Sequence, residues 1–240
     1  MSDFLSRVVP RRAFFHSLYH STYTIPVGND LLSSPAFNFI NPRHHPVNTD
    51  KVSQRIPASA VAGLSDEEIL SLFTGGFFGG FVFRIESWLL RIAGARFLPA
   101  RYTSFQPEPQ AVAIRRPSAI PRRQLLPAGS LFFNSFLLVD KHIAALDNTP
   151  SEPAKTADVN SYVDYGFGSD TSRFAGCHRF RVTRLPPTPE TSDAQIRIDL
   201  EHFRCNPQDN VPSLAEPIKW FHFLYAKALF ANGIQALLKR

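Results

Sequence analysis

Two histidines and a tyrosine occupy positions from which their side chains could act together on one bound molecule. His178 and His202 each lie in a segment of alternating apolar and polar residues, on the apolar parity of that segment. Tyr165 lies on the apolar parity of an earlier alternating segment, 159–168. An imidazole titrates near neutral pH, and a phenol can donate a hydrogen bond to a developing enolate oxygen. We therefore expect proton transfer on an apolar substrate, as in aldol-type cyclisation, dehydration or isomerisation.

The turn between the two histidine segments predicts how these segments pair. A hairpin centred near Pro189 would set His178 opposite Leu200 and His202 opposite Gly176. The two imidazoles would then be diagonal neighbours on one face of the sheet, with their Cα atoms about 7–8 Å apart. The sequence thus predicts two neighbouring imidazoles on an apolar surface.

A second hairpin would bring the tyrosine to the same place. If this hairpin is centred near Asp170, Tyr165 lies opposite Gly176, where the missing side chain leaves a gap. The tyrosine and the two histidines would form a polar patch on a concave wall, with Arg204 one inward position farther toward the rim. The expected catalytic residues are His178, His202 and Tyr165. The expected ligand-binding residues are Arg204, Phe167, Phe174, Phe180, Phe221 and Tyr225.

Two other interpretations of the histidines remain open. Each imidazole could be a hydrogen-bonded core side chain with no chemical role. A metal site made from His178, His202 and His222 is the other alternative, but the part of the chain expected to be ordered lacks His-x-x-x-His and Cys-x-x-Cys spacings. We therefore expect no metal and no other cofactor. The absence of a Gly-x-Ser-x-Gly elbow argues against a serine hydrolase.

These side chains need a sheet that curls around a helix. The segments 173–184 and 194–204 alternate and predict two strands. The last predicted helix, 214–238, is apolar nearly all round, so other elements must wrap it. Its apolar residues include Ile218, Trp220, Phe221, Phe223, Leu224, Tyr225, Leu229 and Phe230. The sequence therefore predicts an α+β fold in which a curved antiparallel sheet grips a long C-terminal helix.

The remaining segments predict two more helices and a long connection. Ser65 and Glu68 have the spacing of a capping box, which begins a helix that should end at Gly75-Gly76. A second helix is expected over 81–93. Residues 28–60 are rich in proline, asparagine and serine and predict an irregular connection.

The composition favours one domain with an N-terminal extension. The chain has 240 residues, 44% of them hydrophobic, which suffices for one core over 61–240, with 1–60 as a basic, proline-rich extension. The formal charge is +6, but the basic residues are dispersed rather than gathered on one helix, so no nucleic-acid partner is expected. The outward face of strand 173–184 would present Arg173, Arg179 and Arg181 to solvent.

The compartment is predicted from the cysteines and the N-terminus. Cys177 and Cys205 would lie far apart on paired strands, which argues against a disulfide and fits a reducing compartment. No apolar run reaches the length of a membrane span, and no secretory signal is recognisable. We expect a cytoplasmic protein, with mitochondrial targeting by the arginine-rich first 27 residues as the alternative.

Several short motifs resemble the START-like, or SRPBCC, superfamily, whose helix-grip fold wraps a curved antiparallel sheet round a long C-terminal helix. The motifs are Tyr165-Gly166, Gly176-Cys-His-Arg-Phe180-Arg-Val182, Ile198-Asp-Leu-Glu-His-Phe203, and the helix 220–238. They are similar to an uncharacterised branch of that superfamily, and the likeness covers about residues 64–240. Cys177 and His178 stand where that branch has acids. The resemblance therefore implies the fold and carries over no catalytic residue.

Two functions from different classes follow. The first is a cofactor-free cyclase, isomerase or dehydratase that acts on a polyketide-like or terpenoid-like molecule of specialised metabolism. The second is a non-catalytic carrier of a lipid or another hydrophobic ligand, with the histidines hydrogen-bonded in the wall of its cavity. In both cases the expected partner is an apolar small molecule.

Overall fold

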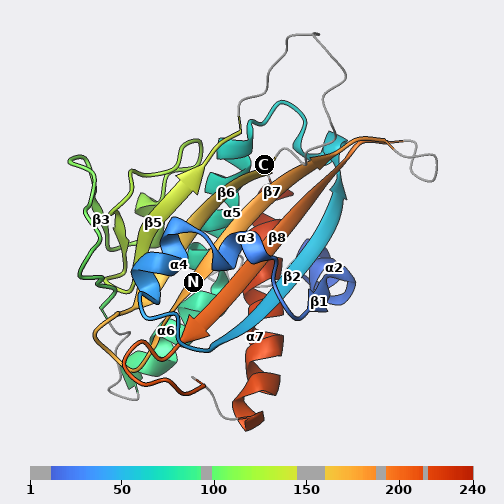
Figure 1. The fold of residues 1–240 in the computed structure, drawn as a ribbon. Helices are drawn as coiled ribbons and strands as arrows, with labels where there is room; N and C mark the ends of the chain where they lie inside the picture. Colours follow the sequence, from blue (N-terminus) through green and yellow to red (C-terminus); the bar gives the residue numbers. More distant parts are fainter. Residues whose placement is uncertain (1–11, 93–98, 145–159, 188–192, 213–215, 240) are drawn as a thin grey trace, which may run out of the picture.

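A computed structural model describes residues 12–92, 99–144, 160–187, 193–212 and 216–239. These residues form an α+β fold around one eight-stranded sheet with the order β1-β2-β8-β7-β6-β5-β4-β3 (Figure 1). The strands are β1 (Thr22–Thr24), β2 (Val47–Pro57), β3 (Ala113–Ile114), β4 (Leu131–Phe132), β5 (Phe136–His142), β6 (Asn160–Gly168), β7 (Ala175–Leu185) and β8 (Gln195–Cys205). The helices are α2 (Arg12–His20), α3 (Asn29–Leu32), α4 (Pro35–Ile40), α5 (Asp66–Gly79), α6 (Phe81–Ile92) and α7 (Glu216–Leu237), with short 3-10 helices at Ala58–Val61 and Pro117–Ala119.

The sheet is mixed and open. Its described strands run antiparallel to their neighbours except for β3 and β4, which run parallel, so the expectation of a fully antiparallel sheet is corrected for this pair. The strands β1 and β3 are its two edges. The predicted coarse architecture, a large curved sheet with a helix at the C-terminal end of the chain, is confirmed by the course of α7 beside the sheet (Figure 1).

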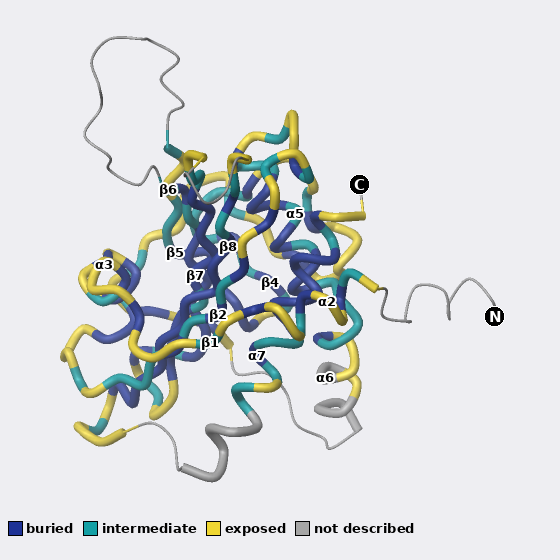
Figure 2. The backbone as a smooth tube through the Cα atoms, turned by 90° about the vertical axis from the view of Figure 1, so that its right-hand side faces the viewer, coloured by how far each residue is buried: buried dark blue, intermediate teal, exposed yellow. Residues whose placement is uncertain are grey.

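Helices cover both faces of the sheet (Figure 1). The helices α5 and α7 lie on one face, over the larger of two hydrophobic cores. The short helices α3 and α4 lie on the other face, over a smaller core that includes Leu31, Phe37, Cys177 and Cys205. Both cysteines are free thiols, and they are diagonal neighbours on β7 and β8 rather than far apart as predicted. Figure 2 shows that the buried part of the chain follows the sheet and α5, so the sheet is the middle of three layers.

The segment expected to be an irregular connection contains a long interior strand. The strand β2 has 11 residues and pairs with β8 along its whole length. Val52 and Ile56 point into the larger core. Asp50 and Gln54 lie on the same face of the strand, and these polar residues interrupt the apolar alternation by which a strand is recognised in the sequence. The expectation of an irregular connection over 28–60 is therefore wrong.

The predicted basic stripe on the outward face of β7 is largely buried. Arg179 is 1% exposed and Arg181 is 8% exposed, because α3 and α4 cover this face. Their carboxylate partners are Asp164, Glu201 and, from α3, Asp30. Arg173, near the end of the strand, does face solvent. The two guanidinium groups therefore contact carboxylates of β6, β8 and α3 instead of the solvent that we expected.

The glycines expected to end the first core helix lie inside it. The predicted capping box is confirmed at the start of α5, but the helix continues through Gly75 and Gly76 to Gly79. A Cβ atom at Gly76 would lie 2.6 Å from the carbonyl oxygen of Asn232 and 2.9 Å from the Cα of Gly233, both in α7. Gly76 therefore permits a backbone-to-backbone approach of α5 and α7.

We expect alanine to have opposite effects at these two adjacent glycines. Gly76→Ala should lower the free energy of unfolding by about 1–3 kcal/mol, because the methyl group would push α5 away from α7. Gly75→Ala meets nothing within 4 Å, so it should raise the free energy of unfolding by about 0.5–1 kcal/mol through helix propensity alone. Urea unfolding of both variants measures this contrast. Equal effects would show that α5 and α7 do not meet at Gly76.

The expectation that no apolar run reaches the length of a membrane span is corrected, since one described stretch, Asp66–Ile85, is long and apolar enough by length and composition. Its large apolar side chains, among them Ile69, Phe73 and Phe77, are buried in the larger core. It therefore has the features of a core helix and is no clear integral membrane segment.

Candidate functional site

Four polar side chains form a row across the sheet on the face that α5 and α7 cover. Asp50, His202, His178 and Tyr165 are successive cross-strand partners on β2, β8, β7 and β6. Directly paired side chains on one face lie close enough to interact. The sheet thus brings together a carboxylate, two imidazoles and a phenol.

The registers of the two hairpins differ from those predicted. His178 lies opposite His202 rather than Leu200, and Tyr165 lies opposite His178 rather than Gly176. Each turn is centred one residue farther along the chain than predicted, which moves every partner by two positions. A shift of two keeps each side chain on its predicted face of the sheet. The imidazoles are therefore direct neighbours instead of diagonal ones.

Three imidazoles and a phenylalanine stack beside one another. The ring centroids of His178 and His202 are 4.9 Å apart, and their planes make an angle of 26°. His222 of α7 lies 4.8 Å from His202, and Phe167 lies 5.7 Å from it at an angle of 10°. Gly176 makes room for this stack, since a Cβ atom there would be 2.4 Å from the ring of Phe167. The helix α7 thus contributes an imidazole to the cluster formed by the sheet.

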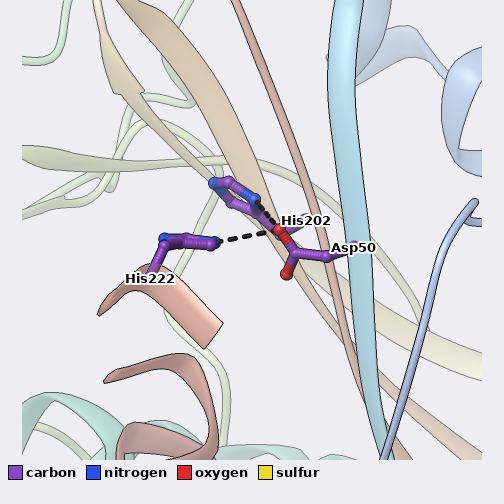
Figure 3. A group of neighbouring side chains, drawn as sticks. All are labelled: Asp50, His202 and His222. Carbon is purple, nitrogen blue, oxygen red and sulfur yellow. Dashed lines mark hydrogen bonds and ion pairs between the residues drawn. The ribbon is translucent and has the colours of Figure 1, made fainter. Parts of the chain in front are cut away.

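Asp50 connects two of these imidazoles. The Nδ1 atom of His202 is 3.0 Å and the Nε2 atom of His222 is 2.9 Å from the same carboxylate oxygen, Oδ2 (Figure 3). An ionised carboxylate only accepts hydrogen bonds, so each of these nitrogens donates its N–H to Asp50. When the His202 ring is neutral, its second nitrogen carries a lone pair. In Figure 3 the second nitrogen of His202 points away from Asp50, so this ring has a free basic atom.

The environment favours a charged carboxylate at Asp50 and neutral imidazoles at His178 and His202. Burial alone would raise the pKa of Asp50, but the attraction and hydrogen bonds of His202 and His222 outweigh it and lower that pKa. Burial lowers the pKa of His202, although Asp50 partly opposes this effect. Burial and the neighbouring imidazoles lower the pKa of His178 well below 6.5. His178 also has a buried Nδ1 atom without a hydrogen-bond partner.

The lowered histidine pKa values predict a loss of stability on acidification. Below pH 6.5 the unfolded chain binds a proton at His178 that the folded protein does not bind, so the free energy of unfolding falls with falling pH. For this side chain the slope should rise toward about 1.4 kcal/mol per pH unit as the pH falls below 6.5. Urea unfolding between pH 7.5 and 5.5 should show a shallower slope for His178→Gln and an unchanged slope for His142→Gln at an exposed site. Identical slopes for the unaltered protein and His178→Gln would contradict the assignment.

A cavity of about 220 Å³ lies against this row of side chains. Its lining residues include six phenylalanine and tyrosine side chains, three histidines and one arginine. The lining residues are Phe77, Phe83, Ser135, Phe136, Phe167, Gly168, Phe174, His178, His202, Arg204, His222, Tyr225 and Leu229. The volume is smaller than the ~300–1,000 Å³ of most small-molecule pockets. The cavity therefore suits a small, mainly apolar molecule.

The cavity includes most of the predicted site residues, but not all. The predicted residues that line it are His178, His202, Arg204, Phe167, Phe174 and Tyr225. Tyr165 is 1% exposed, packs against Phe78, and shares a hydrogen bond of 3.1 Å with the hydroxyl of Thr74. Phe180 is buried in the core, and the side chain of Phe221 lies outside the described residues. The hydroxyl of Tyr165 therefore faces Thr74 instead of the cavity.

Asp50, His202 and His222 could also hold a metal ion. Their ligand atoms lie within 4.8 Å of one another, and two imidazoles with one carboxylate suit zinc or ferrous iron. A nitrogen that donates its proton to Asp50 cannot coordinate a metal at the same time. A metal would therefore have to replace both hydrogen bonds, which already satisfy these two nitrogens.

The sequence reasoning missed Asp50 and considered His222 only as a metal ligand. Asp50 lies on the same face of β2 as the buried Val52 and Ile56, and an acid on a buried face is a sign of a functional residue. This sign can be recognised only if residues 47–57 are known to form a strand. His222 precedes Tyr225 by three positions on α7, so the two side chains share a helix face. That spacing could have placed His222 at the cavity.

No known protein family, curated protein or solved structure matches the chain. The resemblance to the START-like superfamily stays a prediction. We therefore infer the function from the geometry of the cavity and of the row of polar side chains beside it.

Proposed function

We propose that the protein is a helix-grip enzyme of START-like type that binds a small apolar molecule in the sheet cavity and transfers a proton on it without a cofactor. The reaction would be a cyclisation, dehydration or isomerisation of a polyketide-like or terpenoid-like molecule. The observation that carries this proposal is the 3.0 Å hydrogen bond between buried Asp50 and His202 at the wall of the cavity. A carboxylate that orients an imidazole and stabilises its protonated form is a recurrent basis of general-base catalysis.

The proposed chemistry begins at the free nitrogen of His202. This nitrogen takes a proton from a carbon next to a carbonyl group of the bound molecule, and the imidazolium that forms is stabilised by the charge of Asp50. The electron pair moves to the carbonyl oxygen, which becomes an enolate oxygen. The neutral ring of His178, stacked on His202, can donate an N–H to that oxygen. His178 thus takes the role first expected of Tyr165, whose hydroxyl is hydrogen-bonded to Thr74.

The aromatic lining supports this role of the imidazoles. Phe77, Phe136 and Phe167 surround the cavity with apolar surface and limit the water around a bound molecule. With less water, charges that develop during proton transfer interact more strongly with the fixed dipoles and charges of the wall. An apolar ligand also binds by removing this aromatic surface from water.

A second candidate function is that of a carrier without catalysis. The position of Tyr165 favours it, because the hydroxyl that could have assisted an enolate is buried away from the cavity. The histidines would then only hydrogen-bond a ligand or stabilise the wall. The two functions differ in whether proton transfer occurs on the bound molecule.

Exchange of a carbon-bound proton for deuterium separates the two functions without knowledge of the natural substrate. Acetophenone, a small aromatic ketone, would be incubated with the protein in D₂O, and exchange at its methyl group followed by proton NMR. The unaltered protein should accelerate exchange beyond an equal concentration of free imidazole. His202→Ala and His178→Ala should each reduce this acceleration by about 100-fold or more, whereas the exposed His142→Ala should not change it.

Binding of the same ketone would be measured by ligand-observed NMR on all variants. The enzyme proposal expects both histidine variants to bind acetophenone nearly as well as the unaltered protein. Binding without any accelerated exchange would overturn the enzyme and support the carrier. Absence of binding would contradict both functions.

A further inference from the structure

Arg204 is a buried cation without a partner at the wall of the cavity. Its side chain lines the cavity, and the residue is only 5% exposed. Its Nε atom is buried with no hydrogen-bond partner. Among the described residues, no carboxylate forms an ion pair with this guanidinium. Asp50 acts on it from nearby, but it bonds His202 and His222 through Oδ2, and its buried Oδ1 has no hydrogen-bond partner. A cation in this situation has lost much of its hydration and gained no counter-ion in contact with it.

The position of Arg204 relates it to the proposed base. Arg204 follows His202 by two residues on β8, so the two side chains share one face and their Cα atoms are about 6.5–7 Å apart. The cross-strand partner of Arg204 on β7 is Gly176, and the ring of Phe167, which also lines the cavity, lies over this glycine. The guanidinium and the imidazole therefore border the same small space.

We infer that the ligand is an apolar monocarboxylate whose carboxylate group is bound by Arg204. This inference rests on the proposed function and adds the class of molecule that the cavity takes. A guanidinium binds a carboxylate through two parallel N–H donors, and the side chain of Arg204 lines the cavity. The apolar body lies among the aromatic rings, and the carbon that loses its proton to His202 is separated from the carboxylate by a few carbon atoms.

The charges around the cavity favour one negative charge over two. Arg204 is the only permanently cationic side chain among the described residues that line the cavity. The charge of Asp50 acts on Arg204 from nearby and is already negative. A dianion such as a phosphate monoester would add a second negative charge that no lining cation balances. A monocarboxylate brings only one negative charge, so it leaves less negative charge unbalanced in the cavity.

Binding measurements with matched acids and amides test this inference. Octanoate and 3-phenylpropanoate would be titrated into the protein by isothermal calorimetry, each beside its neutral amide and beside inorganic phosphate. The acids should bind about 10- to 100-fold more tightly than their amides. Arg204→Gln should remove this preference, Arg204→Lys should keep part of it, and Arg55→Gln, with the same charge change at an exposed site on β2, should leave it unchanged.

The outcomes distinguish this inference from the proposed function. If acids and amides bind equally well, or if Arg204→Gln keeps the preference, the carboxylate site is overturned while binding of apolar molecules stands. If phosphate binds as tightly as the acids, the assignment to monocarboxylates is wrong. If neither acids nor amides bind, both proposals fail. Thermal unfolding provides a second readout: ligand-free Arg204→Gln should melt no lower than the unaltered protein, and octanoate should raise the melting temperature only when Arg204 is present.

Discussion

Replacing Arg179 with methionine is expected to lower the free energy of unfolding by about 3–5 kcal/mol. The guanidinium of Arg179 holds Asp164 through two short contacts, Nε to Oδ1 at 2.7 Å and Nη2 to Oδ2 at 2.6 Å. Both side chains are buried, and the guanidinium also stacks over the ring of Tyr162 at 4.0 Å. Burial raises the pKa of Asp164, and Arg179 opposes that effect. Without the arginine, the carboxyl group must stay charged without a partner or take up a proton.

Two further variants show whether the loss of stability comes from breaking the buried ion pair or from removing any arginine. Arg173→Met breaks an exposed ion pair with Asp209 and should cost only about 0–1 kcal/mol. The double variant Arg179→Met with Asp164→Leu removes both charges and should regain much of the lost stability. Urea unfolding at pH 7 measures all three. A loss below about 1 kcal/mol for Arg179→Met, equal to that of the surface variant, would contradict the buried pair.

Asp50→Asn is expected to slow the proton exchange of acetophenone by about 100- to 10,000-fold. The amide has nearly the shape of the carboxylate and can still accept from His202, but it carries no charge to stabilise the imidazolium formed there. The negative charge and hydrogen bond of Asp50 act to raise the pKa of His202 against the effect of burial. Their loss makes this imidazole a weaker base, while the shape of the cavity stays the same.

The predicted effect of Asp50→Asn has a spectroscopic counterpart. NMR titration of labelled histidines should show that the pKa of His202 falls further in the variant, and acetophenone should bind with nearly unchanged affinity. Asp140→Asn is the matched control, because Asp140 bonds the hydroxyl of Tyr162 instead of an imidazole. Exchange rates that match those of the unaltered protein would show that the charge of Asp50 plays no part in proton transfer.

The sequence predicted the elements around the cavity well because their patterns are local. The strands expected over 173–184 and 194–204 are β7 and β8, and the helix expected over 214–238 is α7, with ends that differ by one or two residues. Alternation and helical spacing show which face of an element carries its apolar residues, and the apolar face of β7 and β8 lies on the larger core although the opposite face is also covered. Six of the nine predicted site residues consequently line the cavity: His178, His202, Arg204, Phe167, Phe174 and Tyr225.

The features that were not predicted depend on distant parts of the chain. The centre of a hairpin loop is uncertain by a residue, and that uncertainty moved the expected partner of His178 by two positions. Gly76 follows a helix-ending pattern locally, but it is needed inside α5 where α7 crosses. Arg179 lies at a polar position of an alternating strand, which predicts exposure to solvent. Its face of the sheet is buried because α3 and α4 cover it. The acid Asp50 was missed for the same reason, since its strand is recognised by its pairing with β8.

The pairing of β2 with β8 affects how the chain can fold during synthesis. Asp50 and His202 are 152 residues apart, so the carboxylate leaves the ribosome long before its imidazole partner exists. At about 5–20 residues per second, that interval is roughly 8–30 s. During this interval, the backbone N–H and C=O groups of β2 that will pair with β8 have no partner, and the apolar side chains of β2 are exposed. Such a strand can bind chaperones or aggregate. Such a high contact order predicts slow folding, with the reactive cluster among the last parts to form.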